Sequence, residues 1–246
     1  MAEALQSLWT ELAADFHTCF IEKNRWKYLT SGLGNTLLIT FFALLMGVVI
    51  GVVIAIVRST YAKNYKEMKP GFGKKCLAVA NWFGGVYLTV IRGTPVVVQL
   101  MIIYYCIFVS SNNGVLIGAV SFGINSGAYV AEIFRSGIMS IDNGQFEAGR
   151  SLGFNYVQTL RYIVLPQAFK NVLPSLANEF IVLLKETSVA GYVAVRDLTK
   201  GGDIIRGATY QTFMPLLAVA AIYLAMVMFF THLVNILERR LRAGER

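Results

Sequence analysis

The chain has 246 residues, of which 56% are hydrophobic and only 15% are charged, and its mean hydropathy is +0.57. A soluble domain of this length carries about 25% charged residues, so the composition excludes an ordinary water-soluble protein and indicates one membrane domain. The net charge of +8 does not indicate nucleic-acid binding, because the basic residues lie between hydrophobic segments, as the positive-inside rule requires. Three distant cysteines, Cys19, Cys76 and Cys106, show no metal-ligand or disulfide spacing.

The N-terminal segment, residues 1–28, predicts a short amphipathic helix. Its apolar side chains recur at helical spacing, which favours a helix lying on the membrane surface. They are Leu5, Leu8, Leu12, Phe16 and Phe20. The stretch has mixed polarity, without the cationic start and apolar core of a signal peptide. We therefore assign residues 1–30 to an extracytoplasmic or interfacial helix.

The first predicted span, Leu33–Val57, exceeds the roughly 20 apolar residues that a helix needs to cross about 30 Å of hydrocarbon. A strongly basic loop with a single acid, Glu67, is expected after it. Its basic residues are Arg58, Lys63, Lys66, Lys69, Lys74 and Lys75. The positive-inside rule makes this loop cytoplasmic and places the N-terminus outside.

The second predicted span, Leu77–Ser110, is interrupted by Arg92-Gly93-Thr94-Pro95. Pro95 has no N–H, so the carbonyl of Ile91 loses its usual helical donor. A broken helix near the middle of a membrane is a common feature of substrate sites.

Three further spans and one long loop complete the predicted topology. The spans are Val115–Ile138, Ile163–Leu184 and Phe213–Leu237, and a loop of mixed charge is expected at residues 185–211. Five spans with an outside N-terminus put the C-terminus in the cytoplasm, which agrees with its basic residues. The membrane domain would then be residues 31–240, followed by a cytoplasmic tail at 241–246.

Two GxxxG pairs, Gly47 with Gly51 and Gly123 with Gly127, permit close helix approach in the first and third spans, although such pairs are common in membrane helices. An odd number of spans disfavours a transporter built from two inverted repeats. We therefore expect the five-helix unit to line a pathway together with a second copy or a close homologue.

A polar segment, residues 140–162, separates the third and fourth spans. Residues 144–152 predict a short helix, with Asp142 or Asn143 as its N-cap and Gly153 as its stop. A second amphipathic helix is expected at Tyr156–Tyr162, and Pro166 suits the start of the fourth span. Such a rigid knob can carry the motion of a partner into the membrane, whereas the plain alternative is an interfacial loop.

This segment resembles the "EAA" loop of permease subunits of bacterial ATP-binding-cassette importers. The matching elements are Glu147-Ala148-Gly149, Gly153 and Ile163-x-Leu165-Pro166. Three other stretches are similar to the polar amino acid branch of that family, over about residues 30–240 in all. They are Arg92–Pro95 with Gln99, Ala128–Arg135 and Leu184–Ser188. Glu186 departs from the Asp or Asn of many members, which leaves the substrate open.

The resemblance implies an all-α integral membrane protein of the type I importer class, with five transmembrane helices and a cytoplasmic coupling loop at 140–166. It implies a bacterial inner membrane location, a homodimer or close heterodimer, an extracytoplasmic solute-binding protein and separate ATPase subunits. The coupling residues would be Glu147, Ala148, Gly149, Leu152, Gly153, Leu165 and Pro166.

This chain is not expected to be an enzyme or to hold a cofactor. Gly71–Lys75 lacks the spacing of a P-loop, so ATP and Mg²⁺ would be bound by the partner ATPase. A membrane enzyme is disfavoured because His17 and His232 are isolated. A passive channel would have no need of the 140–166 knob, and a secondary transporter usually has more spans.

Charged residues inside the predicted spans indicate a solute pathway, because such charges are expensive unless they face a cavity or a bundle interior. Arg92 and nearby freed N–H groups would hold the carboxylate of an amino acid, and Glu132, Glu179 or Glu186 its ammonium. Asn125, Tyr129, Glu132 and Ser136 are spaced 4, 3 and 4 residues apart and so share one helix face. The candidate pathway residues are Arg92, Gly93, Thr94, Gln99, Asn125, Tyr129, Glu132, Glu179, Glu186, Thr187 and Ser188.

The alternative is that Arg92 simply pairs with Glu132 or Glu179 and fixes helix packing. Arg135 is interpreted as a cytoplasmic anchor, and Lys185 as part of a gate or as a side chain that reaches the interface. The three acids beside Arg92 and Lys185 allow a cationic or a neutral polar amino acid, and favour a basic or polar one.

Overall fold

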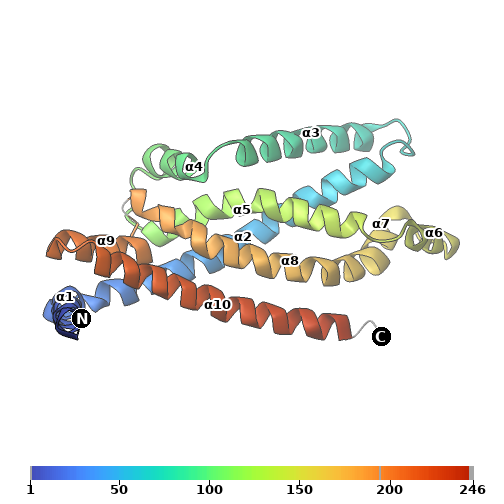
Figure 1. Cartoon of the computed structure of the whole chain (residues 1–246). Coiled ribbons are helices and arrows are strands. Elements are labelled where there is room, and N and C mark those ends of the chain that lie inside the picture. The colour runs from blue at the N-terminus through green and yellow to red at the C-terminus, as the bar shows by residue number, and fades with distance from the viewer. Residues whose placement is uncertain (1, 194, 244–246) are drawn as a thin grey trace.

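The computed structural model describes residues 2–193 and 195–243, and within these ranges the chain is helical, with no β-strand. Figure 1 shows an elongated bundle whose long helices run side by side. They are α2 (Trp26–Asn64), α3 (Phe72–Gly93), α5 (Gly114–Met139), α8 (Leu165–Glu186) and α10 (Phe213–Ala243). The all-α prediction is confirmed.

Shorter elements gather at the two ends of the bundle. One end holds α1 (Ala2–Phe16), α4 (Val96–Ile102) and α9 (Leu198–Thr209), and the other holds α6 (Asn143–Ser151) and α7 (Tyr156–Thr159) (Figure 1). Short 3-10 or π-helical segments adjoin these helices among the described residues. They are η1 (His17–Ile21), η2 (Glu22–Asn24), η3 (Ile103–Ile107), η4 (Leu160–Val164) and η5 (Thr187–Val193). The described C-terminal end of α10 lies at the α6 end, opposite α1.

The predicted spans all appear as helices, with one important change of shape. Among the described residues, α2, α5 and α10 are long and apolar enough to cross a bilayer. The helices α3 and α4 to Ile107 pass the same test together, as a pair bent by 108°. Helix α8 has 22 residues, which give roughly 33 Å at 1.5 Å per residue, but it is less apolar because it carries four charged side chains.

Two predicted loops are wrong in extent. The basic loop at 58–75 shrinks to the turn at 65–71, because α2 continues to Asn64 and α3 already begins at Phe72. Residues 185–211 are not a loop but η5 and α9. The Asp197 carboxylate caps α9 by accepting from the N–H groups of Thr199 at 3.0 Å and Lys200 at 2.9 Å.

The N-terminal helix is shorter than predicted. Helix α1 ends at Phe16, and Lys23 and Asn24, both with φ of 54°, turn the chain so that α2 begins at Trp26. The buried Arg25 side chain donates to the Thr18 carbonyl and to Glu22, which fixes this turn. Phe20 is buried and Leu12 half-buried, whereas Phe16 is exposed. The side chains of Leu5 and Leu8, like residues 244–246 of the predicted tail, lie outside the described set.

The two predicted GxxxG pairs pack against each other's helices. A Cβ on Gly51 of α2 would lie 2.6 Å from Val130 Cγ1 and 2.7 Å from the Ala131 nitrogen of α5. A Cβ on Gly123 of α5 would lie 2.6 Å from Met46 Cε of α2. The prediction that these glycines allow close helix approach is therefore confirmed.

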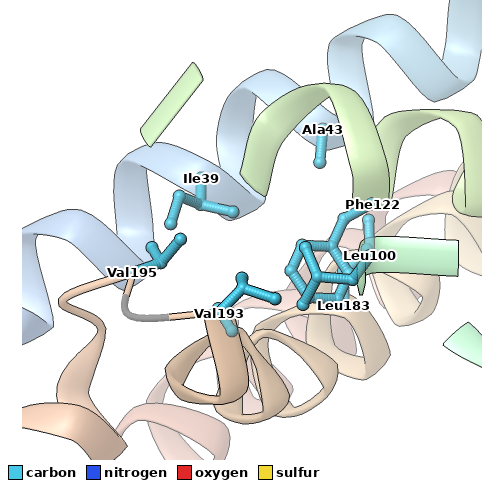
Figure 2. Close-up of a cluster of buried hydrophobic side chains, with 8 residues drawn as sticks. Ile39, Ala43, Leu100, Phe122, Leu183, Val193 and Val195 are labelled. Carbon is cyan, nitrogen blue, oxygen red and sulfur yellow. The ribbon is translucent and has the colours of Figure 1, made fainter. Parts of the chain in front are cut away.

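A buried apolar cluster joins the bent helix to this pair. Figure 2 shows Ile39 and Ala43 of α2, Leu100 of α4, Phe122 of α5 and Leu183 of α8 together with Val193 and Val195. Leu100, Phe122 and Leu183 are completely buried. The second arm of the bent pair is thus anchored in the core, which fixes the position of the break between α3 and α4.

Gly51→Ala is expected to destabilise the protein by about 1–3 kcal/mol, because the added methyl collides with Val130 and with the α5 backbone. Thermal unfolding of the detergent-purified protein measures the loss. Gly34→Ala, in the same helix, is the matched control, since a Cβ there meets nothing within 4 Å. Equal melting temperatures for the two variants would contradict a tight α2–α5 contact.

Candidate functional site

The polar segment between α5 and α8 forms a rigid knob, residues 142–159. The Asp142 carboxylate accepts from the Gly144 N–H at 2.6 Å and caps α6, and Gly153, with φ of +81°, ends it. Asn155 and Gln158 then cap α7 reciprocally, each side chain bonding the other's N–H at 2.9 Å. The predicted helix–Gly–helix arrangement is confirmed.

The predicted helix at 156–162 is present, and it continues from α7 through η4 into α8 without a break. The wide turn of η4 comes directly before Pro166 and accommodates a residue that cannot donate a backbone hydrogen bond. The knob is therefore a direct extension of α8.

Tight packing holds α6 against α7 and against the end of α2. A Cβ on Gly149 would lie 2.5 Å from Thr159 Oγ1, so the contact between α6 and α7 requires glycine there. The rings of Phe146 and Tyr156 stack at 5.8 Å, and burial raises the pKa of the Tyr156 phenol. Lys63 of α2 lies 4.1 Å from the Phe146 ring centre. The knob is thus packed against the end of α2 and continuous with α8.

The seven residues predicted for coupling divide into a surface set and a supporting set. Glu147, Ala148, Leu152 and Gly153 are exposed, and Leu152 retains 72% of its accessible surface. Pro166 is exposed on the first turn of α8. Gly149 is buried and Leu165 packs against the apolar cluster at the base of the knob. The exposed set is apolar except for Glu147, which lines a pocket together with Lys63 and Glu67 at the end of α2.

The break between α3 and α4 is closed by a side chain. Gln99 Nε2 donates to the Ile91 carbonyl at 2.7 Å and lies 2.8 Å from Thr94 Oγ1. Asn125 Nδ2 of α5 donates to Gln99 Oε1 at 3.0 Å, and both amides are buried. The Ile91 carbonyl, which Pro95 leaves without a backbone donor, therefore has a side-chain donor in Gln99. The break is a hydrogen-bonded hinge.

A pocket of about 580 Å³ lies beside this hinge, between α3, α5 and α8. Four of the predicted pathway residues line it: Arg92, Tyr129, Glu132 and Glu179. The Arg92 guanidinium lies 5.7 Å from the centre of the Tyr129 ring. Ser126 Oγ donates to a Glu179 carboxylate oxygen at 2.8 Å. One cation and one hydrogen-bonded acid thus face the same space.

Charge pairing in the pocket differs from the predicted alternative. The described structure contains no ion pair between Arg92 and either Glu132 or Glu179; instead Arg135 Nε donates to both Glu132 oxygens, at 3.1 and 3.2 Å. Arg135, interpreted as a cytoplasmic anchor, neutralises Glu132. Arg92 therefore forms no ion pair with either acid, and its positive charge faces the pocket.

The other predicted pathway residues lie elsewhere. Gly93, Thr94, Gln99 and Asn125 belong to the hinge, so Asn125 does not share the pocket face with Ser136, which does line the pocket. Glu186 ends α8, the Thr187 hydroxyl donates to the Leu184 carbonyl, and Ser188 lines a different pocket beside α9.

Sequence reasoning missed two polar residues of α8 that line the pocket, Asn171 and Ser175. They precede Glu179 at intervals of four residues, so helical spacing alone could have found them. It also missed Arg58, whose side chain lies in a groove between α2 and α3.

Comparison with known proteins gives consistent results. Residues 77–243 match the family described as "Binding-protein-dependent transport system inner membrane component". A putative glutamine transport system permease protein of Rickettsia typhi is 36% identical over 217 residues, which are 87% of this chain and 93% of that protein. The glutamine transport system permease protein of Escherichia coli (strain K12) is 38% identical over 168 residues, 67% of this chain and 77% of that one.

Two solved structures are also similar. The crystal structure of an amino acid ABC transporter with histidines has a TM-score of 0.76 and 39% identity, and covers 90% of this chain and 98% of that chain. An inward-facing structure of a methionine ABC transporter has a TM-score of 0.73 at 20% identity, and covers 88% and 97%. The second shows that the fold is shared.

Gln99→Leu is expected to destabilise the protein by about 1–3 kcal/mol, because the Ile91 carbonyl and the Asn125 amide lose their partner inside the bundle. Thermal unfolding in detergent is the measurement. In the double variant with Asn125→Leu, the second substitution should cost much less than Asn125→Leu alone. Additive losses would show that the two amides are not coupled.

Proposed function

This chain belongs to the family of inner membrane components of binding-protein-dependent transport systems, and we propose that it is the permease subunit of an ATP-driven importer of polar amino acids. The observation that carries the substrate class is the pocket between α3, α5 and α8. An amino acid has a carboxylate and an ammonium, and the pocket offers Arg92 for the first and Glu179 for the second. Tyr129 and Ser136 add a ring face and a hydroxyl.

A neutral polar amino acid suits the pocket better than a basic one. A basic side chain needs a further carboxylate, but Glu132 is already bonded to Arg135, and Glu186 does not line this pocket. The asparagine and serine side chains of α8 instead offer hydrogen bonds to an amide. Two relatives are named for glutamine, which supports the same choice.

The knob is proposed to dock on a separate ATPase subunit, which binds ATP and Mg²⁺. Its exposed face presents Glu147, Ala148 and Leu152, while Gly149 and the stacked Phe146 and Tyr156 keep it stiff. Because α7 runs on into α8, motion of the knob passes along α8 to Glu179, roughly 21 Å from Leu165 at 1.5 Å per residue.

Assembly and orientation follow from the same geometry. The basic residues at the ends of α2 and α3 lie at the end of the bundle that carries the knob, so we propose that this end is cytoplasmic and that α1 lies outside, at or near the lipid surface. The opposite end, with α9, would receive the solute-binding protein.

A second copy of this chain would complete the pathway, because one bundle leaves the α3 side open.

Leu152→Glu is expected to release the ATPase subunit during detergent purification, because it puts a charge on an apolar docking surface without disturbing the fold. The measurement is the ATPase to permease ratio after affinity purification through the permease. Phe72→Glu is the matched control, since Phe72 is also exposed, at 85%, but starts α3 outside the knob. Unchanged copurification of the Leu152 variant would contradict the docking role.

Arg92→Gln and Glu179→Gln are each expected to lower amino acid uptake about tenfold or more, the size of a lost charge-assisted hydrogen bond. Uptake of radiolabelled L-glutamine and L-arginine into proteoliposomes with the whole transporter is the measurement. Lys69→Gln, on the exposed turn between α2 and α3, is the control. Normal uptake with both pocket variants would contradict the pathway, and preferential wild-type uptake of L-arginine would replace the neutral substrate with a basic one.

A further inference from the structure

One arginine of α2 occupies a position that the proposed function does not use. Arg58 lies against two consecutive glycines of α3. A Cβ on Gly84 would stand 3.8 Å from Arg58 Cγ, and one on Gly85 would stand 3.0 Å from Nη1. The glycines therefore leave room for the guanidinium between the two helices, and its far end would be in tight contact with a Cβ at Gly85.

The Arg58 side chain has hydrogen-bonding capacity that the described residues leave unused. Its Nε atom is buried and has no hydrogen-bond partner among them. A buried donor on a charged group is costly when it is left unsatisfied, so the position of Arg58 is not explained by hydrogen bonds to the described residues.

The groove that contains Arg58 adjoins the amino acid pocket. It has a volume of about 860 Å³, and its lining includes Arg92 and Glu132, which also line the pocket. Arg58 and Arg92 both attract the Glu132 carboxylate electrostatically. Arg92 thus stands at the boundary between the two cavities, with Arg58 beyond it.

The groove extends from the amino acid pocket toward the knob. Arg58 precedes Lys63 by five residues in α2, and Lys63 Nζ donates to Asn143 of the knob at 3.3 Å. A solute that passed from the pocket into the groove would therefore move from Arg92 to Arg58 and toward the end at which α6 lies (Figure 1).

We propose that Arg58 forms a second carboxylate subsite, which receives the solute's carboxylate from Arg92 on the way to the knob end. The guanidinium fork is suited to bidentate binding of a carboxylate. Glu132, neutralised by Arg135, adds no unpaired negative charge that would repel it. This inference rests on the proposed amino acid transport and adds a residue and a step to it.

The test uses the purified permease–ATPase complex without the solute-binding protein, so that only the membrane sites contribute. The probes are radiolabelled L-glutamine and its α-amide, which lacks the carboxylate. Arg58→Gln should weaken L-glutamine binding about tenfold and leave α-amide binding unchanged, because only a carboxylate loses its charge partner. Arg58→Lys should restore only part of the affinity lost in Arg58→Gln, because it keeps the charge but not the bidentate fork.

Two further variants separate the subsite from a structural effect. Gly85→Leu should also weaken L-glutamine binding, because its side chain would extend into the space that the guanidinium occupies while the arginine keeps its charge. Lys69→Gln removes one positive charge from the exposed turn of the same hairpin and should change nothing. Melting temperatures confirm that each complex is folded.

Equal L-glutamine affinity in the wild type and Arg58→Gln, or equal weakening of both probes, would overturn the subsite. Loss of copurified anionic phospholipid with unchanged L-glutamine binding would overturn it too, and would assign the groove to a lipid headgroup. Failure of the proposed function looks different, since no amino acid would then bind to the wild-type complex.

Discussion

The contact between α2 and α5 determines where the other parts of the molecule lie. Apolar surfaces gain little by meeting each other in lipid, so close helix pairs depend on van der Waals contact, which small residues allow. Gly51 and Gly123 bring the two backbones together in this way. The rest of α2 then supports the knob through Lys63, and the opposite face of α5 supplies Tyr129 and Glu132 to the pocket.

The broken helix meets a second constraint, since backbone polar groups inside a bilayer need partners within the protein. Pro95 removes one donor, and Gln99 replaces it while Asn125 holds Gln99 in place. The break therefore costs little in hydrogen bonds, and it ends α3 beside the middle of α5, where Arg92 reaches the pocket. Leu100, packed in the core of Figure 2, keeps the second arm from straightening.

Local signals in the sequence account for what was predicted correctly. Apolar length indicated the spans, the pair Asp142 and Gly153 indicated the bounds of α6, and the glycine pairs indicated a close contact without naming its partner. The prediction of a loop at 185–211 is wrong because α9 is short and weakly apolar. Its N-cap, Asp197, is a local signal that this prediction left out. Helical spacing put Asn125 on the face of Tyr129, but Gln99, 26 residues away, draws its side chain to the hinge.

The pairing of charges was missed although part of it is local. Arg135 and Arg92 are both candidates for Glu132, but Arg135 lies three residues along the same helix, and that is the pair the structure contains. The acid and the cation of the pocket therefore belong to different parts of the fold. Glu179 is tied to Ser126, and a Cβ on Gly47 of α2 would lie 3.1 Å from Ser126 Oγ, so the acid belongs to the rigid α2–α5 body.

Arg92 belongs to α3, which reaches that body through the hinge and the Tyr87 hydroxyl bond to the Ile124 carbonyl. Leu88 of α3 also lies in a buried cluster with Ala128 and Ala131 of α5, so a movement of α3 relative to α5 would change both this contact and the separation of the cation and the acid. The same movement would alter the space at Gly85 that Arg58 occupies. In the proposed pathway, binding at the pocket and passage toward the knob would be coupled through the position of this one helix.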